Sequence, residues 1–144
     1  MKAIGQSTWA GTWKEGTGTI STSDGTLNEV PYSYASRFDG APGASPEELF
    51  GAAHAGCFNQ ALANNFGMIG FKADWIRTSI EIEVGTGEDG HPAITGSHIT
   101  VTAAAPNVSQ EQFDYCAERA RVHCTIAKIL KIDPTMVATL VPSA

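Results

Sequence analysis

The chain has 144 residues, of which 42% are hydrophobic and 17% are charged, and its net charge is −6. These values are typical of one globular domain and exclude a disordered or fibrous protein. They also argue against a nucleic-acid partner, because phosphate binding needs clustered lysine and arginine side chains, which this sequence lacks. We therefore predict a single domain over residues 1–144.

The N-terminal residues lack the continuous apolar stretch of a signal peptide, and no apolar segment is long enough to span a bilayer. This pattern predicts a cytoplasmic protein with no membrane partner. Cytosolic thiols are kept reduced, so the three cysteines do not form a structural disulfide framework. Each cysteine is a core residue, a metal ligand or a reactive group, and the predicted function depends on which of these roles the cysteines have.

The first part of the chain is predicted to be β-structure. Short alternating runs lie around Trp9–Trp13, Gly18–Thr22 and Val30–Tyr34, and turn residues separate them. The glycine- and proline-containing stretch Arg37–Ser45 is predicted to be a loop.

A helix is predicted to begin directly after this loop. Ser45 can cap the first N–H groups, Pro46 suits the first helical position, and Glu48 completes a capping box. The helix is expected to run to about Phe66. Its middle, residues 51–57, consists mostly of glycine and alanine, which permits close approach of a neighbouring element. A second copy of the chain is one candidate for that neighbour.

The remaining sequence predicts two strands, a helix and a final strand. Strand-like alternation covers residues 74–85 and Thr95–Ala105, and a second capping-box pattern starts a helix at Ser109 that continues toward Leu130. The last strand is Thr135–Val141. The order βββ-α-ββ-α-β indicates an α+β fold with mainly antiparallel strands.

The three cysteines differ in their surroundings. Cys57 lies among small residues and is either a core residue or a nucleophile, whereas Cys116 has only core character. Cys124 is expected to be reactive, because nearby cations favour a thiolate. These cations are His123, Arg119, Arg121 and Lys128.

Helix geometry restricts which cysteines can pair. Cys116 and Cys124 would lie about 12 Å apart along an unbroken helix, whereas the Cα atoms of a disulfide lie within about 7 Å. Cys57 and Cys124 lie on different predicted elements and can meet, but the spacing alone does not establish that they do.

Two other kinds of site use the same residues. His54 and Cys57 lie one helical turn apart and, with His123 and Cys124, could supply zinc ligands, but adjacent ligands rarely converge on one tetrahedral centre. His54 and Cys57 could also form a hydrolase dyad, although no nucleophile-elbow motif accompanies them. We therefore predict neither a metal nor a cofactor.

One part of the chain carries a specific motif. It consists of Ser36-Arg37-Phe38-Asp39-Gly40 followed by Ser45-Pro46-Glu47-Glu48-Leu49-Phe50-Gly51-Ala52-Ala53-His54-Ala55-Gly56-Cys57-Phe58. Further matching segments are residues 23–28, Pro31-Tyr32 and residues 120–130. In this order and over nearly the whole chain, the sequence resembles the OsmC/Ohr family (osmotically inducible and organic hydroperoxide resistance proteins), and within it the OsmC branch.

The resemblance implies a fold, an assembly and a site. The fold is an OsmC-like intertwined homodimer, in which antiparallel sheets wrap around two long central helices and the two active sites lie at the subunit interface. Cys57 is then the peroxidatic cysteine and Cys124 the resolving one. Arg37 contacts the reactive thiolate and Glu47 orients that arginine, whereas Cys116 has no role.

The implied activity is the reduction of organic hydroperoxides by a thiol peroxidase. Desolvation of a buried Cys57 would disfavour its thiolate, so a cation such as Arg37 is needed. A sulfenate on Cys57 and a disulfide to Cys124 follow, and an external dithiol, for which a lipoylated protein is one candidate, restores both thiols.

Other residues bear on the substrate. An apolar pocket or the core is expected to hold four aromatic residues, namely Tyr32, Phe38, Phe50 and Phe58. Thr125 departs from the family pattern, which usually has proline directly after the second cysteine. The alternative function is a dimeric module that binds a small ligand and whose cysteines are incidental.

Overall fold

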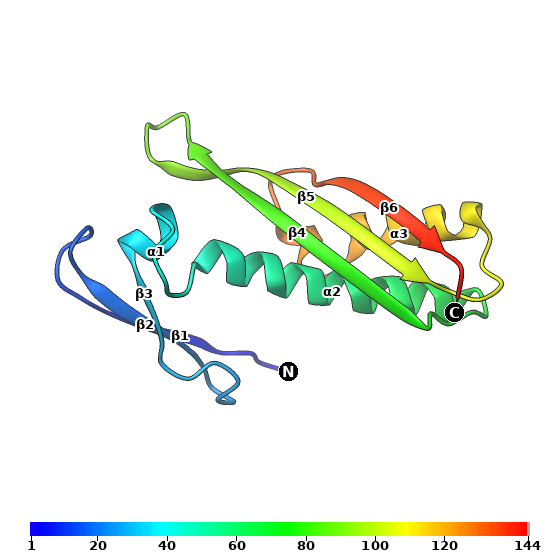
Figure 1. Cartoon of the computed structure of the whole chain (residues 1–144), viewed down its shortest axis with the longest axis horizontal. Coiled ribbons are helices and arrows are strands. Elements are labelled where there is room, and N and C mark those ends of the chain that lie inside the picture. Colours follow the sequence, from blue (N-terminus) through cyan, green and yellow to red (C-terminus); the bar gives the residue numbers. More distant parts are fainter. Residues whose placement is uncertain (144) are drawn as a thin grey trace. The chain divides into compact units, whose positions relative to one another are not determined.

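The structure, a computed structural model, describes residues 1–143, and these form two compact units that meet in the sequence between Leu49 and Phe50. Because the chain divides into two compact units, the single domain inferred from the sequence stays a prediction. The first unit contains an antiparallel sheet in the order β1-β2-β3 and a short helix (Figure 1). Its elements are β1 (Gly5–Ala10), β2 (Thr17–Thr22), β3 (Val30–Ser33) and α1 (Tyr34–Phe38).

Two local features of this unit differ from the prediction. The first strand ends at Ala10 and does not reach Trp13, because Gly11 has a φ of +94°, a left-handed conformation that favours glycine. The start of the predicted loop belongs to α1. Ser33 and Ser36 cap this helix reciprocally, since each side chain accepts a hydrogen bond from the backbone N–H of the other.

The second unit combines a sheet with two helices that pack on one of its faces (Figure 1). Strands β4 and β5 are antiparallel, but β5 and β6 are parallel, because α3 forms a crossover between them. The elements are α2 (Pro46–Met68, which begins in the first unit), β4 (Trp75–Thr86), β5 (Pro92–Ala104), α3 (Gln110–His123), the 3-10 turn η1 (Ala127–Ile129) and β6 (Thr135–Val141).

The core of this unit lies between the sheet and the two helices. Asn65 of α2 donates a hydrogen bond from Nδ2 to the carbonyl oxygen of Cys116 in α3, over 3.0 Å. Cys116 is buried in this core, as the sequence indicated. The apolar side chains at the centre come from α2 (Phe58, Leu62, Phe66), β5 (Ile99, Val101, Ala103) and α3 (Phe113, Ala117, Ala120).

The second long helix is shorter than expected. The pattern predicted a helix toward Leu130, but α3 ends at His123 because the backbone of Cys124 is extended, with φ −62° and ψ 151°. The helix is continuous between Cys116 and His123, which agrees with the prediction that Cys116 and Cys124 lie too far apart to pair.

Gly51 lies where α2 approaches the sheet closely. A Cβ atom built at this position would lie 2.9 Å from the carbonyl oxygen of Ile80 in β4, so helix and strand would have to separate. We expect Gly51→Ala to lower the free energy of unfolding by about 1–3 kcal/mol, as overpacking does, although alanine favours helix. Urea or thermal unfolding measures the change.

Gly67 provides the matched control in the same helix. A Cβ atom there would have no neighbour within 4 Å, so Gly67→Ala should leave stability unchanged or raise it by up to about 1 kcal/mol. If Gly51→Ala were as stable as Gly67→Ala, the close helix–strand contact would be contradicted.

None of the helices within residues 1–143 combines the length and the apolar character that crossing a bilayer requires.

Candidate active site

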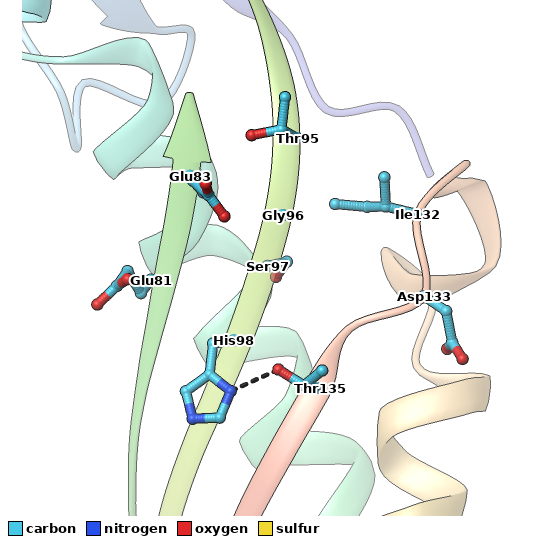
Figure 2. Close-up of a pocket in the computed structure, with 9 residues that line it drawn as sticks. All are labelled: Glu81, Glu83, Thr95, Gly96, Ser97, His98, Ile132, Asp133 and Thr135. Atoms are coloured by element: carbon cyan, nitrogen blue, oxygen red, sulfur yellow. Dashed lines mark hydrogen bonds between the residues drawn. The ribbon is translucent and has the colours of Figure 1, made fainter. Parts of the chain in front are cut away.

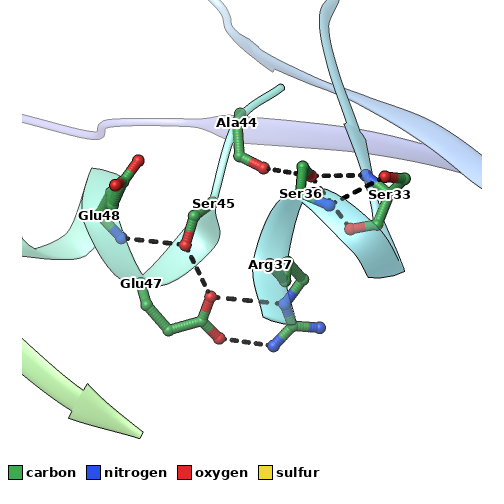
Figure 3. A network of polar contacts seen from close by, with 7 residues as sticks. All are labelled: Ser33, Ser36, Arg37, Ala44, Ser45, Glu47 and Glu48. Carbon is green, nitrogen blue, oxygen red and sulfur yellow. Dashed lines mark hydrogen bonds and ion pairs between the residues drawn. The ribbon is translucent and has the colours of Figure 1, made fainter. Parts of the chain in front are cut away.

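Arg37 and Glu47 form a two-pronged ion pair in the first unit (Figure 3). Arg37 Nη2 donates to Glu47 Oε1 over 2.5 Å, and Arg37 Nε donates to Oε2 over 3.4 Å. The two side chains are only 29% and 15% exposed, respectively, so this is not the fully solvated surface pair that contributes little. The partnership inferred from the resemblance is therefore present in the structure.

Serine hydroxyls hold the segments on either side of this ion pair (Figure 3). Ser45 donates from Oγ to Glu47 Oε2 over 3.0 Å and accepts the backbone N–H of Glu48 over 3.3 Å, which is half of the predicted capping box. Ser36 donates to the carbonyl oxygen of Ala44 over 2.8 Å. These bonds fix the loop between α1 and α2, and with it the direction of the carboxylate.

The charge of Glu47 is stabilised despite its partial burial. Desolvation disfavours the carboxylate, but hydrogen bonds from Arg37, from a backbone N–H and from Ser45, together with the charge of Arg37, outweigh it. The pKa of Glu47 is thus held below its usual range. The resulting stabilisation is present above the unfolded pKa and is lost only as the pH falls through the lower folded value, so Glu47 stays ionised at neutral pH.

Cys57 and Cys124 line one cavity of about 480 Å³ in the second unit. Both thiols are free. The segment after α3 contacts both sulfur atoms, because Ile126 N–H donates to Cys57 Sγ over 3.5 Å and Ala127 N–H donates to Cys124 Sγ over 3.4 Å. The other residues that line the cavity are Gln60, Ala61, Asn64, His123 and Thr125.

Cys57 is more accessible than expected. The small residues around it suggested burial, but the structure leaves Cys57 half-exposed at the cavity, while Cys124 is only 3% exposed. The reason is that α2 turns a different face, which includes Phe58, toward the sheet. A peroxide can thus reach the first cysteine more easily than the second.

His54 does not form the dyad considered from the sequence. Its side chain is fully buried, and neither ring nitrogen has a hydrogen-bond partner within residues 1–143, so it does not bond to Cys57. Burial lowers the pKa of His54, which favours a neutral ring. Within the same residues, no three histidine, cysteine or carboxylate side chains are grouped so that they could hold a metal ion.

Cys124 is a protonated thiol at neutral pH. Burial raises its pKa, and the neighbouring Cys57 raises it further, whereas the N–H of Ala127 opposes these effects only in part. The expectation that nearby cations would favour a Cys124 thiolate was wrong.

Two of the cations expected near Cys124 are engaged elsewhere. Arg121 donates from Nη2 to Glu118 over 2.7 Å and from Nη1 to Asp133 over 2.5 Å. The guanidinium of Arg119 lies over a tyrosine ring at 5.7 Å. The prediction treated residues close to Cys124 in sequence as close to it in space. Side chains at successive helix positions point in different directions, so this does not follow.

A second cavity, of about 260 Å³, lies beside Arg37 in the first unit. Trp13 packs edge-on against Tyr34, with 5.0 Å between the ring centroids, and Trp9 lies 5.2 Å from Tyr32. We refer to this cavity as the aromatic pocket, and its lining residues are Trp9, Trp13, Tyr32, Tyr34 and Arg37.

The four aromatic residues singled out from the sequence have different environments. Tyr32 lines the aromatic pocket, and Phe38 packs beneath Arg37, whose guanidinium carbon lies 4.7 Å from the ring centroid. Phe58 belongs to the core, and Phe50 lies 6.3 Å from His54.

Sequence reasoning missed two cavities. One is the aromatic pocket, whose signal was the tryptophan and tyrosine alternation in the first strands. The other is an acidic cavity of about 400 Å³ on the second sheet, which includes Glu81, Glu83 and Asp133 (Figure 2). There His98 Nδ1 is hydrogen-bonded to Thr135 Oγ1 over 2.5 Å. This cavity contains no cysteine.

Comparison with known proteins identifies the class to which this fold and these cysteines belong. Residues 38–138 match the family described as OsmC-like protein. Over 132 residues, covering 92% of each chain, the sequence is 38% identical to Peroxiredoxin OsmC of Escherichia coli (strain K12) and equally so to that of Shigella flexneri. The chain therefore belongs to the OsmC-like family.

Solved structures share the fold. A Vibrio cholerae OsmC-like protein of unknown function aligns with a TM-score of 0.76 at 14% identity, covering 96% of this chain and 99% of that one. The organic hydroperoxide resistance protein OhrB of Bacillus subtilis aligns with a TM-score of 0.68 at 21% identity, covering 95% and 97%. The predicted α+β OsmC-like fold is confirmed.

Proposed function

We propose that the chain is a cysteine-based peroxidase that reduces organic hydroperoxides to alcohols with electrons from a dithiol. The observation that carries this proposal is the single cavity lined by both Cys57 and Cys124. Peroxide reduction needs a thiolate nucleophile and a second thiol that resolves the product, and this cavity offers both. Membership of the OsmC-like family and 38% identity to a peroxiredoxin support the same chemistry.

Cys57 is the peroxidatic residue. Its thiolate attacks the terminal oxygen of the hydroperoxide, the O–O bond breaks, and the departing alkoxide takes a proton from solvent to become the alcohol. Cys57 is left as a sulfenic acid. The N–H of Ile126 supports the negative sulfur, and Arg37, held by Glu47, supplies the compensating positive charge.

Cys124 is the resolving residue. Its sulfur attacks the Cys57 sulfenic acid, the S–O bond breaks, and a disulfide and water are formed. An external dithiol then reduces the disulfide by exchange and is itself oxidised, and a lipoylated protein is one candidate. Because this cycle needs a supply of reduced dithiol, we place it in the cytoplasm, where thiols are kept reduced.

The aromatic pocket supports an organic substrate over hydrogen peroxide. Its four rings offer apolar surface beside the Arg37 guanidinium, which accepts no hydrogen bond and donates to oxygen. An alkyl or aryl group can lie against Trp13 and Tyr34 while the peroxide oxygens meet the arginine. Hydrogen peroxide has no organic group and gains nothing from these contacts.

Trp13→Leu tests this assignment, because it removes one ring from the pocket and keeps an apolar side chain. We expect kcat/KM for cumene hydroperoxide to fall about tenfold, which corresponds to ~1.4 kcal/mol and matches the upper range for one aromatic contact. The value for hydrogen peroxide should stay within about twofold. Steady-state peroxide consumption with a dithiol reductant measures both.

Trp75 on β4 supplies the control. It lies in the second unit, where the Arg77 guanidinium carbon is 4.6 Å from its ring centroid. Trp75→Leu should lower neither value selectively. An equal loss for both peroxides in Trp13→Leu would contradict the pocket as the site of the organic group, and a wild-type chain that consumes neither would favour a ligand-binding module.

The proposed assembly is a homodimer. Helix α2 buries one face against the sheet, and its opposite face of mostly small residues, including Ala52, Ala53 and Gly56, is exposed in the single chain. A helix whose exposed face is also largely apolar favours a further packing partner, which a second copy can provide. A mass of one chain by light scattering would contradict this part of the proposal.

A further inference from the structure

Resolution of the sulfenic acid requires Cys124 to lose a proton. Its thiol is almost fully buried and protonated at neutral pH, and the backbone N–H of Ala127, which donates to its sulfur, cannot accept that proton. The neighbouring Cys57 sulfur also contacts this thiol, but once Cys57 is a sulfenic acid that sulfur is the atom under attack. The thiol is a poor nucleophile and the thiolate a good one. A base close to Cys124 would therefore accelerate disulfide formation.

His123 is placed to be this base. It is the last residue of α3, directly precedes Cys124, and lines the cavity that contains both cysteines. Imidazole is the side chain whose ordinary titration range covers neutral pH, so it can accept and return a proton there.

Among the described residues that line the cavity, His123 is the side chain best suited to this role. Gln60, Asn64 and Thr125 line the cavity but do not titrate, and the remaining titratable lining groups are the two cysteines themselves. The neighbouring charged groups are cations or carboxylates already engaged with cations, namely Arg119 over Tyr115, Arg121 with Glu118 and Asp133, and the exposed Lys128.

We propose that His123 is the general base that accepts the Cys124 proton, directly or through one water, during disulfide formation. This inference rests on the proposed function. As the Cys124 sulfur attacks the Cys57 sulfenic sulfur, the S–H proton moves to the imidazole, the S–S bond forms and the S–O bond breaks. The departing hydroxide receives the proton from the imidazolium and leaves as water, so His123 is regenerated.

His123→Asn tests the proposal in a single turnover, because asparagine keeps a polar side chain but cannot act as the base. After one equivalent of cumene hydroperoxide, the Cys57 sulfenate should form within about twofold of the wild-type rate. Disulfide formation at pH 7 should be slower by about tenfold or more, since general bases contribute about 10²–10⁴-fold at full effect. Rapid quenching with dimedone and mass spectrometry separates the two steps.

The pH profile separates a base from a structural role. The wild-type resolution rate should decrease on the acid side of its pH profile. His123→Asn should lack this decrease and should follow only the ionisation of Cys124 at alkaline pH. Free imidazole should restore part of the rate in His123→Ala, because the cavity is open and measures about 480 Å³. A folding defect would not respond to imidazole.

His98→Asn is the matched control. This imidazole lies on β5 and is hydrogen-bonded to Thr135 (Figure 2). It does not line the cysteine cavity, so both steps should keep the wild-type rate and profile. Wild-type resolution and an unchanged pH profile in His123→Asn would overturn the role of His123. Absence of any sulfenate in the wild-type protein would instead overturn the proposed function.

Discussion

Cys57→Ser is expected to reduce the consumption of organic hydroperoxide to the uncatalysed background. A serine hydroxyl does not ionise at neutral pH and cannot form a sulfenate, so the first chemical step is lost. Because loss of a nucleophile removes nearly all covalent catalysis, we expect a decrease of at least about 10³-fold. The ferrous oxidation assay for tert-butyl hydroperoxide, with a dithiol in excess, measures the rate.

Cys116→Ala provides the comparison for this variant. Cys116 is fully buried in the core between α2 and α3, and burial raises the pKa of its thiol, so it is the least reactive cysteine. Its replacement should preserve turnover while lowering stability slightly. Turnover retained by Cys57→Ser, or lost in a folded Cys116→Ala, would contradict the assignment of Cys57.

The second large effect is expected for Cys124→Ser. Without the resolving thiol, the sulfenate on Cys57 should persist, and one equivalent of hydroperoxide should leave one dimedone-reactive site per chain. The wild-type protein should instead gain a Cys57–Cys124 disulfide. Peptide mapping by mass spectrometry before and after the pulse distinguishes these products.

A different disulfide would argue against the proposed pair. Cys57 and Cys124 line one cavity, whereas the Cys116 side chain is enclosed in the core. A bond between Cys57 and Cys116 in the Cys124→Ser variant would require the core to open, and finding it would assign the resolving role to Cys116.

Local signals predicted the start of the two long helices, α2 and α3, correctly. Pro46 begins α2 as expected, and Ser109 and Gln112 form the full reciprocal cap of α3. Such contacts involve residues three apart, so the sequence contains all the information needed. The end of α3 was predicted too late in the chain. Cys124 departs from helical geometry where the segment that follows contacts the Cys57 sulfur.

The candidate site was only partly predictable. The Arg37–Glu47 ion pair was predicted from the family resemblance, because a single sequence does not distinguish an exposed ion pair from a functional one. The aromatic pocket was missed because its rings come from β1, from the turn after β1, from β3 and from α1. Their meeting depends on sheet register, which pairs Gly18 with both Trp9 and Tyr32. The prediction that nearby cations favour a Cys124 thiolate was wrong for a related reason, since it depends on side-chain direction.

The parallel pairing of β5 and β6 has a consequence for how well the protein resists overoxidation of Cys57. The crossover that contains α3 and Cys124 is anchored in the sheet at both ends, by β5 and by β6, while Cys57 lies on a long helix packed against the same sheet. Two groups that the fold holds near each other react at a high effective concentration, because neither has to diffuse through solvent to reach the other. In the proposed cycle, resolution then outpaces a second peroxide encounter, which would carry Cys57 irreversibly to the sulfinic acid. If Cys57 and Cys124 act as proposed, we expect the crossover to protect the protein against inactivation by the peroxide.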